Sequence, residues 1–509
     1  GGNAADAAVA VQFALAVCFP YAGNIGGGGL LVYRPANGES NALDFREKAP
    51  LAAHRDMYLD EKGEVIPNLS VFGRLSAGVP GSVAGMFELH QRYGQLPWAD
   101  LIQPAIDLAR KGFAATAHES KWLNDQKADF ERYNKGGQAY LVRAEPWQAG
   151  DTLRQEDLAQ SLERIRDLGR DGFYKGKTAA LLVAEMKRGG IITQADLDGY
   201  EAKWRAPLRG KFGEYGIVTM PPPSSGGIAL LQMLGMIDPF PVQEWGPDGA
   251  KTIHLMVEAE RRAFADRAEY AADPDFVQIP VQGLLDPGYL TQRMADFDSH
   301  KATLSDSIRH GKPRHEPTET THFSIVDPQG NAVSVTTTLN SPYGSKVWVA
   351  GAGFLLNNEM DDFSVKPGVP NIFGLVGNEA NTVAASKRML SSMTPTIVER
   401  DGKILMVLGT PGGATIPTSI LQVILDVTRH GMTLQEAVDF KRFHHQWLPD
   451  EVMVEDSAFS VETWQALVAM GHRICVREPI GRVDAILRHR NGKREGAADR
   501  RRDDVARGF

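Results

Sequence analysis

The chain has 509 residues, of which 43% are hydrophobic and 23% charged, a composition typical of a globular protein with about two to four domains. Its net charge of −8 and its pI near 5.9 argue against a nucleic-acid-binding protein, because such a protein needs a basic face. The two cysteines, Cys18 and Cys475, cannot make a disulfide framework.

The first 319 residues carry mainly helical patterns. Ala4–Val17 is nearly all apolar or small, which predicts a buried helix, and Ile253–Tyr270 predicts another. Pro104–Lys111 and Leu158–Leu168 have the spacing of amphipathic helices. No apolar run reaches the roughly 18 residues that span a bilayer, so no membrane-spanning helix is predicted. The chain starts inside a helical pattern without a methionine, and we expect its natural N-terminus to lie further upstream.

Strand patterns dominate from residue 320 onward. Two runs with an alternating component, 320–326 and 332–338, flank the sequence Pro-Gln-Gly-Asn, which predicts a β-hairpin. The preceding segment, 302–319, is polar and contains two prolines, and it is the clearest linker in the chain. The sequence is therefore expected to divide into a helix-rich part, 1–319, and a strand-rich part, 320–509.

Two further elements are predicted in the second part. Thr396–Glu399 and Ile404–Leu408 predict a hairpin with an Asp-Gly turn. Thr433 and Glu436 have the spacing of a capping box, ahead of a helix expected at Ala437–Phe443.

Thr320 begins the first of these hairpins and is a candidate nucleophile. If the peptide bond between Glu319 and Thr320 were cleaved, Thr320 would carry both a hydroxyl and a free α-amine. The reference pKa of an α-amine is about 7.7–8.0, so this amine can act as a general base on its own hydroxyl. Threonine is also common in strands because β-branched residues suit the pleat, and the hairpin alone leaves that structural role open.

Several sequence blocks place this threonine in a wider pattern that runs, in order, from residue 1 to about 450. They resemble the γ-glutamyltranspeptidases, a family of N-terminal-nucleophile hydrolases whose small subunit begins with a segment similar to 319–340. The other blocks are Gly-Gly-Asn-Ala-Ala-Asp-Ala-Ala at 1–8, Leu-Asp-Phe-Arg-Glu at 43–47, Leu-Leu-Asn-Asn-Glu-Met-Asp-Asp-Phe at 355–363, Leu-Ser-Ser-Met-Thr-Pro-Thr at 390–396 and Gly-Thr-Pro-Gly-Gly at 409–413. The resemblance implies that Thr320 is the nucleophile and is released by cleavage after Glu319.

The resemblance also implies a receptor for the α-carboxylate of a γ-glutamyl group. The matching residues are Arg46, Ser391 and Ser392. A guanidinium fork fits a carboxylate bidentately, although an arginine amid apolar neighbours is more usually paired with a carboxylate of the protein itself. Without the resemblance, the serines would be interpreted as turn or cap residues.

The α-ammonium of the same group needs acceptors, preferably charged ones. The family uses residues that match Asn340, Glu359 and Asp362 for this contact, with Gln or Glu at the position of Glu359. The alternative is that both acids are ordinary surface carboxylates, which is the commonest state of Asp and Glu.

The remaining predicted site residues would act on the nucleophile and the reacting carbonyl or form a loop that covers the site. Gly412 and Gly413 match the family's oxyanion hole, where glycine lets backbone N–H groups approach a ligand closely. Thr338 matches a second threonine that hydrogen-bonds the nucleophile. Pro367–Asn378 resembles a lid loop, and Phe373 lies where well-described members carry tyrosine, so it keeps an aromatic wall without the hydroxyl.

Two other patterns are interpreted as structural. Gly26–Gly29 lacks the flanking residues of a phosphate-binding loop, which favours a tight backbone turn. His254 with Glu258 on one helix face, and the adjacent pair His444 and His445, come without a metal-binding motif, so no metal site is predicted.

The resemblance implies an α+β fold, a four-layer αββα sandwich of the N-terminal-nucleophile type, formed jointly by a large subunit, 1–319, and a small subunit, 320–509, of one self-cleaving precursor. It implies a γ-glutamyltransferase and glutathione hydrolase that needs no cofactor and passes the γ-glutamyl group to water, amino acids or dipeptides. It further implies a heterodimer of the two subunits, located in the periplasm or secreted. The alternatives are a glutaryl (cephalosporin) acylase or a poly-γ-glutamate hydrolase of the same family, and a non-catalytic γ-glutamyl-binding protein.

Overall fold

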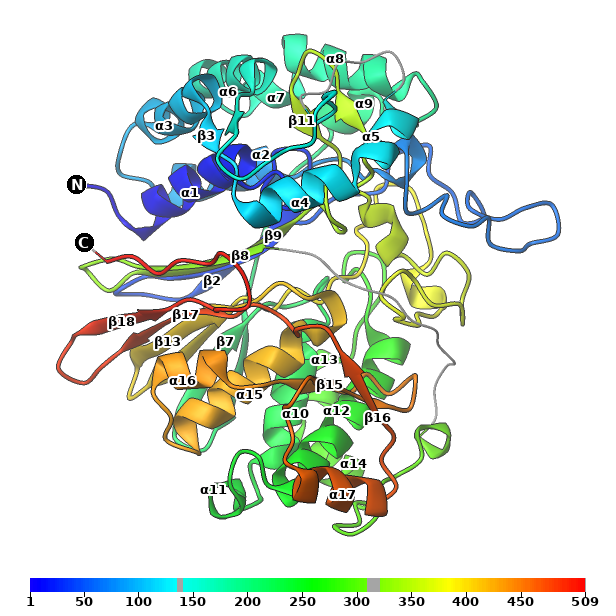
Figure 1. Ribbon diagram of the computed structural model, residues 1–509, viewed down its shortest axis with the longest axis vertical. Coiled ribbons are helices and arrows are strands. Elements are labelled where there is room, and N and C mark those ends of the chain that lie inside the picture. Colours follow the sequence, from blue (N-terminus) through cyan, green and yellow to red (C-terminus); the bar gives the residue numbers. More distant parts are fainter. Residues whose placement is uncertain (135–140, 309–320, 509) are drawn as a thin grey trace.

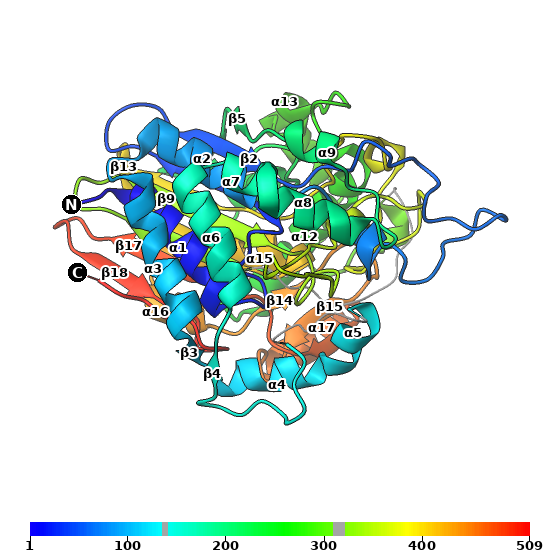
Figure 2. The same ribbon diagram turned by 90° about the horizontal axis from the view of Figure 1, so that it is seen from above.

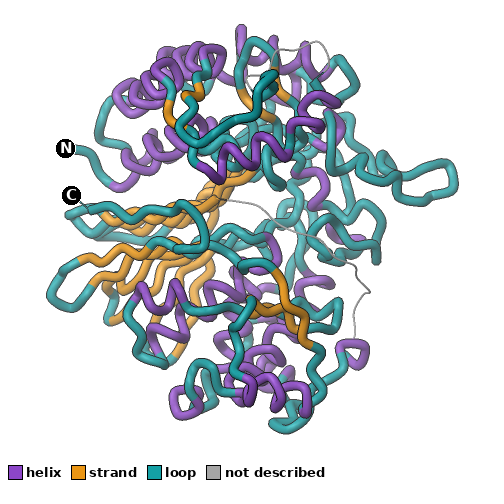
Figure 3. The backbone as a smooth tube through the Cα atoms, viewed as in Figure 1, coloured by secondary structure: helices purple, strands orange, loops and turns teal. Residues whose placement is uncertain are grey.

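The computed structural model describes residues 1–134, 141–308 and 321–508. Two large β-sheets lie face to face at its centre, and helices cover their outer faces (Figure 1). Figure 3 shows the same arrangement by element type, with the strands gathered between two groups of helices. The mixture of helices and mainly antiparallel sheet confirms the predicted α+β class.

The first sheet has five strands, all antiparallel to their neighbours. The predicted hairpin is confirmed, since its two strands pair from Thr321 opposite Thr337 to Val326 opposite Ala332. In sheet order the strands are β5 (Lys203–Arg205), β2 (Asn41–Phe45), β1 (Gly28–Arg34), β9 (Ala332–Thr338) and β8 (Thr321–Val326).

The second sheet has six strands, again antiparallel throughout. The second predicted hairpin is confirmed, and its turn residues Asp401 and Gly402 both have positive φ, as the Asp-Gly signal predicts. In sheet order the strands are β18 (Arg494–Ala497), β17 (Asp484–Arg488), β13 (Lys403–Gly409), β12 (Thr396–Arg400), β7 (Tyr215–Thr219) and β6 (Leu208–Phe212).

Helices cover each sheet on the side away from the other sheet. Figure 2 shows the helices over the first sheet from above: α1 (Ala4–Cys18), α2 (Ser82–Tyr93), α3 (Trp98–Lys111) and α6 (Glu156–Leu168). Those over the second sheet are α10 (Gly226–Ile237), α12 (Ala250–Tyr270), α15 (Ile416–Thr428) and α16 (Leu434–Asp439). Within the described ranges, no helix is long and apolar enough to cross a membrane.

Shorter elements complete the described chain. The helices are α4 (Ala117–Asp125), α5 (Lys127–Tyr133), α7 (Asp171–Tyr174), α8 (Gly176–Met186), α9 (Gln194–Asp198), α11 (Val242–Trp245), α13 (Val281–Leu284), α14 (Pro287–Arg293) and α17 (Val461–Ala469). The strands are β3 (Phe113–Ala114), β4 (Thr152–Leu153), β10 (Trp348–Val349), β11 (Phe354–Leu355), β14 (Phe443–His444), β15 (Val452–Glu455) and β16 (Ile474–Arg477). Single 3₁₀ turns are η1 (Arg74–Ser76), η2 (Ser305–Ser307), η3 (Glu359–Asp362), η4 (Glu379–Asn381) and η5 (Gly413–Thr415).

Local signals explain where the predicted helices begin. Asn3 caps α1, because its side chain accepts hydrogen bonds from the backbone of Ala5 and Asp6 while Asp6 accepts one from Asn3. The four helices predicted before residue 319 are present as α1, α3, α6 and α12, and α3 begins one turn or more earlier than expected, with Pro104 inside it.

The helix expected at Ala437–Phe443 is placed wrongly. Thr433 does form the predicted capping box, but α16 ends at Asp439. Phe443 instead pairs with Val454 in a short strand, and its N–H donates to the side chain of Gln422 at 3.2 Å. The backbone groups that would form hydrogen bonds within a longer helix are therefore paired with these distant partners instead.

The side chains of β1 alternate between two cores. Leu30 and Val32 belong to the core that lies between the two sheets and continues under the helices of the second sheet. Leu31 and Tyr33 instead pack under α1 and α2. Because the sheets meet face to face, polar groups between them must find partners, and Ser334 on β9 donates to the carbonyl of Leu408 on β13 at 3.0 Å.

Both sheets take strands from either side of the predicted boundary at 319/320. In the first sheet, β1 pairs with β9 along seven residues, and in the second, β7 pairs with β12. The predicted cleavage site itself, Glu319 and Thr320, lies outside the described residues. The boundary therefore runs through both sheets.

Candidate active site

Most of the predicted site residues line one small cavity, although they come from segments far apart in sequence. Three residues that were not predicted to belong to the site, Arg267, Met393 and Ile416, also line it. The predicted ones are Arg46, Thr338, Asn340, Glu359, Asp362, Phe373, Ser391, Ser392 and Gly413.

Arg46 follows the end of β2, and its guanidinium is fully buried. It forms ion pairs with Glu359 and Asp362, and Nη2 also donates to the carbonyl of Leu390 at 2.9 Å. Burial opposes the charge, but the attraction of Glu359, Asp362 and Glu47 outweighs it and raises the pKa of Arg46. In this conformation, the expected protein carboxylates do pair with the arginine.

The three carboxylates around Arg46 carry more negative charge than one guanidinium neutralises. Burial raises the pKa of Asp362 to about 6 and that of Glu47 to about 8, despite the opposing effect of Arg46. Burial likewise raises the pKa of Glu359 well above its usual range. This side of the cavity is therefore suited to a cationic group such as an ammonium, which would favour the ionised acids.

The serine segment Ser391–Ser392 is held by the loop that precedes α10. The N–H of Ser391 donates to the carbonyl of Pro223 at 3.0 Å, and the N–H of Ser225 donates back to the carbonyl of Ser391 at 2.8 Å. Ser224 adds a hydrogen bond from its hydroxyl to the carbonyl of Met393 at 2.7 Å. The loop at 221–227 therefore supports the serine segment, a contact that no local sequence pattern predicts.

Thr338 and Asn340 stand at the end of β9. The N–H of Asn340 donates to the hydroxyl of Thr338 at 2.7 Å, and the Asn340 amide donates to the carbonyl of Asn358 at 3.0 Å. Glycine at position 27 allows the chain to enter β1 beside them, since a Cβ there would lie 2.1 Å from the carbonyl oxygen of Thr338. The run Gly26–Gly29 thus serves a close backbone approach.

Gly412 and Gly413 lie between β13 and α15, with φ values of 139° and 51°. Gly413 lines the cavity and begins the 3₁₀ turn that leads into α15. Backbone N–H groups at the start of helical turns attract negative charge, which is what an oxyanion hole requires.

The predicted lid loop borders the cavity through Phe373. Phe373 is buried and packs in a cluster with Phe264 and Trp447. The neighbouring Asn371 donates to Asp362 at 3.0 Å, so the lid also contacts one of the acids around Arg46.

Arg267 is a site residue that the sequence reasoning missed. It lies near the end of α12, where Nε donates to the hydroxyl of Ser225 at 3.0 Å and Nη2 approaches the hydroxyl of Ser392 at 3.4 Å. Burial lowers the pKa of Arg267 to about 10 despite the attraction of Asp362. No local signal distinguishes it from Arg261 and Arg262 on the same helix.

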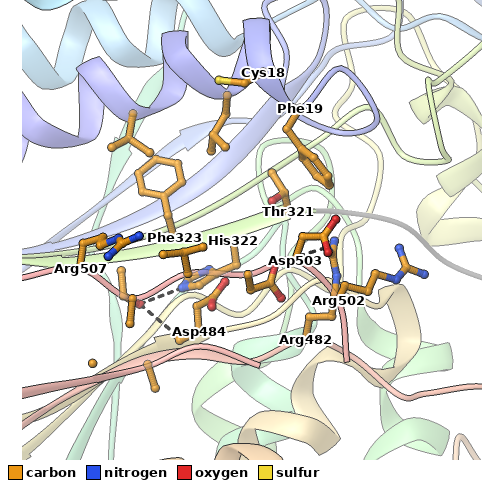
Figure 4. Close-up of a pocket in the computed structure, with 18 of the residues that line it drawn as sticks. Cys18, Phe19, Thr321, His322, Phe323, Arg482, Asp484, Arg502, Asp503 and Arg507 are labelled. Carbon is orange, nitrogen blue, oxygen red and sulfur yellow. Dashed lines mark hydrogen bonds and ion pairs between the residues drawn. The ribbon is translucent and has the colours of Figure 1, made fainter. Parts of the chain in front are cut away.

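A larger cavity, of about 420 Å³, lies between α1, β8 and the C-terminal segment. Figure 4 shows Thr321, His322 and Phe323 of β8 beside Asp484, Arg502 and Asp503. His322 is neutral, because burial lowers its pKa to about 3, and its ring nitrogens pair with the hydroxyls of Thr336 and Ser324, each at 3.0 Å. Of the predicted site residues that the structure describes, none lines this cavity, and nine of them line the smaller one.

His254, Glu258 and His472 form the group of possible metal ligands that the described residues contain. His254 Nδ1 and His472 Nε2 are hydrogen-bonded to each other at 2.7 Å. Glu258 is already paired with Arg261 and Arg262. Because guanidinium groups neutralise the carboxylate, the geometry favours a structural polar cluster, and the absence of a metal site stays a prediction.

Known proteins resemble this chain over most or all of its length. The family model described as Gamma-glutamyltranspeptidase matches residues 1–509. A glutathione hydrolase proenzyme from Pseudomonas sp. (strain A14) is 48% identical over 489 residues, covering 96% of this chain and 85% of that protein. The crystal structure of cephalosporin acylase from Bacillus halodurans has a TM-score of 0.86 at 26% identity, covering 100% of this chain and 92% of its own. The γ-glutamyltranspeptidase structure from Helicobacter pylori has a TM-score of 0.59 at 44% identity, covering 61% of this chain and 89% of its own.

Proposed function

The chain belongs to the gamma-glutamyltranspeptidase family, and from that membership we propose that it cleaves γ-glutamyl amides such as glutathione and transfers the γ-glutamyl group to water, amino acids or dipeptides. The observation that carries the proposal is the cavity itself. It combines acids that suit an ammonium, cations and hydroxyls that suit a carboxylate, and a glycine turn that suits an oxyanion.

The reaction runs in two acyl-transfer steps. The Thr320 hydroxyl attacks the γ-carbonyl carbon, and its proton passes to the Thr320 α-amine. The N–H groups of Gly412 and Gly413 stabilise the tetrahedral oxyanion, and Thr338 orients the nucleophile. The proton then moves to the leaving amine as the C–N bond breaks, which leaves an ester on Thr320. Water or an acceptor amine attacks that ester, and Thr320 recovers its proton.

Substrate recognition uses the two sides of the cavity. Asn340, Glu359 and Asp362 receive the α-ammonium of the γ-glutamyl group. Arg46, Ser391 and Ser392 receive its α-carboxylate. An incoming ammonium competes with Arg46 for the acids, which frees guanidinium donors for the carboxylate. Phe373 closes the cavity as part of the lid.

Maturation follows from the same nucleophile. The Thr320 hydroxyl attacks the carbonyl carbon of Glu319, and the C–N bond breaks to give an ester and the free α-amine. Water then hydrolyses that ester, which leaves a large subunit, 1–319, and a small subunit, 320–509, that remain associated as a heterodimer. The fold is then the four-layer αββα sandwich of N-terminal-nucleophile hydrolases, shared by both subunits. The mature protein acts in the periplasm or outside the cell.

A glutaryl acylase is the second candidate, because the structural neighbour from Bacillus halodurans is a cephalosporin acylase. The substrates of a glutaryl acylase are glutaryl amides, which lack the α-amine of a γ-glutamyl group. The acids that surround Arg46 argue for the γ-glutamyl substrate, since they would have no ammonium to bind in a glutaryl group. The closed lid likewise argues against poly-γ-glutamate, because a polymer would be crowded there.

The test is release of p-nitroaniline from γ-glutamyl-p-nitroanilide, with and without glycylglycine, and from glutaryl-p-nitroanilide in parallel. We expect rapid release from the γ-glutamyl compound, faster with glycylglycine, and none by a Thr320→Ala variant. Faster release from the glutaryl compound would identify an acylase. Binding of γ-glutamyl compounds without any release would identify a binding protein.

A further inference from the structure

Arg267, which is half-buried at the cavity wall, differs from the deeply buried arginines in one respect. Each of the five arginines that are almost fully buried has a carboxylate partner: Arg46, Arg261, Arg262, Arg388 and Arg442. Arg267, in contrast, has no ion pair with any carboxylate in the described residues, and its hydrogen bonds go to two serine hydroxyls. A guanidinium that is partly withdrawn from water and has only neutral hydrogen-bond partners is stabilised when an anion binds beside it.

The position of Arg267 shows where such an anion would bind. The guanidinium borders the cavity and approaches Ser392, on a segment already expected to contact the substrate. Arg46, which borders the same cavity, is occupied by Glu359, Asp362 and the carbonyl of Leu390. An anion that enters the cavity therefore meets two acids paired with Arg46, whereas the hydrogen-bond partners of Arg267 are neutral hydroxyls and Asp362 acts on Arg267 only from beyond ion-pair distance.

We propose that Arg267 is a specificity-determining residue that binds the α-carboxylate of the donor beside Ser392. The inference rests on the proposed function, and it adds a second cation to the carboxylate receptor. A γ-glutamyl head group then spans the cavity, with its ammonium among the acids and its carboxylate between the two guanidinium groups. Ser225 is a positioning residue, because its hydroxyl accepts from Arg267 Nε while its N–H holds the serine segment.

The experiment uses three p-nitroanilides and two variants. γ-Glutamyl-p-nitroanilide carries both charged groups, glutaryl-p-nitroanilide lacks the ammonium, and 4-aminobutyryl-p-nitroanilide lacks the carboxylate. Arg267→Met should lower kcat/KM for the two carboxylate-bearing compounds about a hundredfold more than for the 4-aminobutyryl compound. Asp362→Asn is the matched control, and it should spare the glutaryl compound instead. Arg267→Lys keeps the charge without the fork, so it should recover part of the carboxylate preference.

Ratios between substrates are measured on one protein sample, so they are independent of how much of a variant folds. Equal losses on all three substrates would show that Arg267 only supports the serine segment, and would overturn the inference. An unchanged ratio in an active Arg267→Met variant would overturn it too.

A binding measurement separates this inference from the proposed function. Glutamate and glutarate should raise the melting temperature of the wild type more than 4-aminobutyrate does, and Arg267→Met should abolish that difference. A wild type that shows the difference but releases no p-nitroaniline would refute the proposed reaction while supporting the carboxylate site. A wild type that hydrolyses the γ-glutamyl compound but shows no such dependence on Arg267 would refute the carboxylate site alone.

Discussion

Replacing Arg46 by lysine should weaken both substrate binding and the folded state, although it keeps the charge. The guanidinium contacts Glu359, Asp362 and the carbonyl of Leu390 at once, through two different nitrogens. A single lysine ammonium cannot hold both carboxylates and the carbonyl in this geometry, so at least one charge-assisted hydrogen bond is lost. Each such bond contributes about 1.5–3 kcal/mol.

The expected result is a fall of about 1.5–3 kcal/mol in the free energy of unfolding and a rise in KM of roughly ten- to a hundredfold. Unfolding in denaturant and initial rates on γ-glutamyl-p-nitroanilide measure the two quantities. Arg205→Lys is the matched control, because Arg205 also bridges two acids, Asp44 at 2.8 Å and Asp275 at 2.9 Å, but does not line the cavity. It should lose stability without a change in KM.

Two outcomes would refute this reasoning. If Arg46→Lys kept the wild-type KM, the guanidinium fork would have no part in recognition. If Arg205→Lys raised KM as much as Arg46→Lys does, the effect would come from general destabilisation.

Three further predictions concern maturation, the oxyanion hole and pH. Purified wild type should show fragments of 319 and 190 residues on a denaturing gel, whereas Thr320→Ala should stay as one band; an active wild type that remains uncut would contradict the mechanism. Gly413→Val should lower kcat by about 10²–10³. Because valine at a φ of 51° also costs about 1–2 kcal/mol, thermal unfolding must show a native-like transition; normal turnover in a folded variant would mean that the glycines form only a turn. Burial raises the pKa of Asp362 to about 6, so its negative charge is lost as pH falls through 6, and KM for the γ-glutamyl anilide should rise there. Asp362→Asn should lack that pH dependence, and a KM that stays flat from pH 7 to 5 in the wild type would remove Asp362 from ammonium binding.

Features with a local cause could be predicted from the sequence. The capping box at Thr433, the Asp-Gly turn at 401–402 and the hairpin after residue 320 each depend on neighbours a few residues away, and each is present. Their signals need no knowledge of the tertiary structure.

Features with distant partners could not be predicted in this way. The helix after Thr433 stops at Asp439 because Phe443 pairs with a strand that follows it, which no local pattern reveals. Arg267 enters the cavity only because loops around residues 225 and 392 converge on the end of α12.

The candidate site could be predicted only from the family resemblance. The motif residues Arg46, Glu359 and Asp362 do meet in one cavity, and a protein carboxylate was expected beside the arginine, but no local pattern indicates that these two acids would be its partners. That engagement depends on the approach of η3 to the end of β2, which is a product of the whole fold. The roles proposed for these residues stay predictions until the variants are measured.

The pairing of β1 with β9 and of β7 with β12 has a consequence for a chain cut after residue 319. Neither fragment alone could complete a sheet, since each would expose a long, apolar edge strand that invites aggregation. Fragments produced separately would therefore fail to become soluble. Fragments cut within the folded precursor would instead keep the strand pairing that had already formed between them. Covalent continuity would then be needed to build the molecule but not to maintain it.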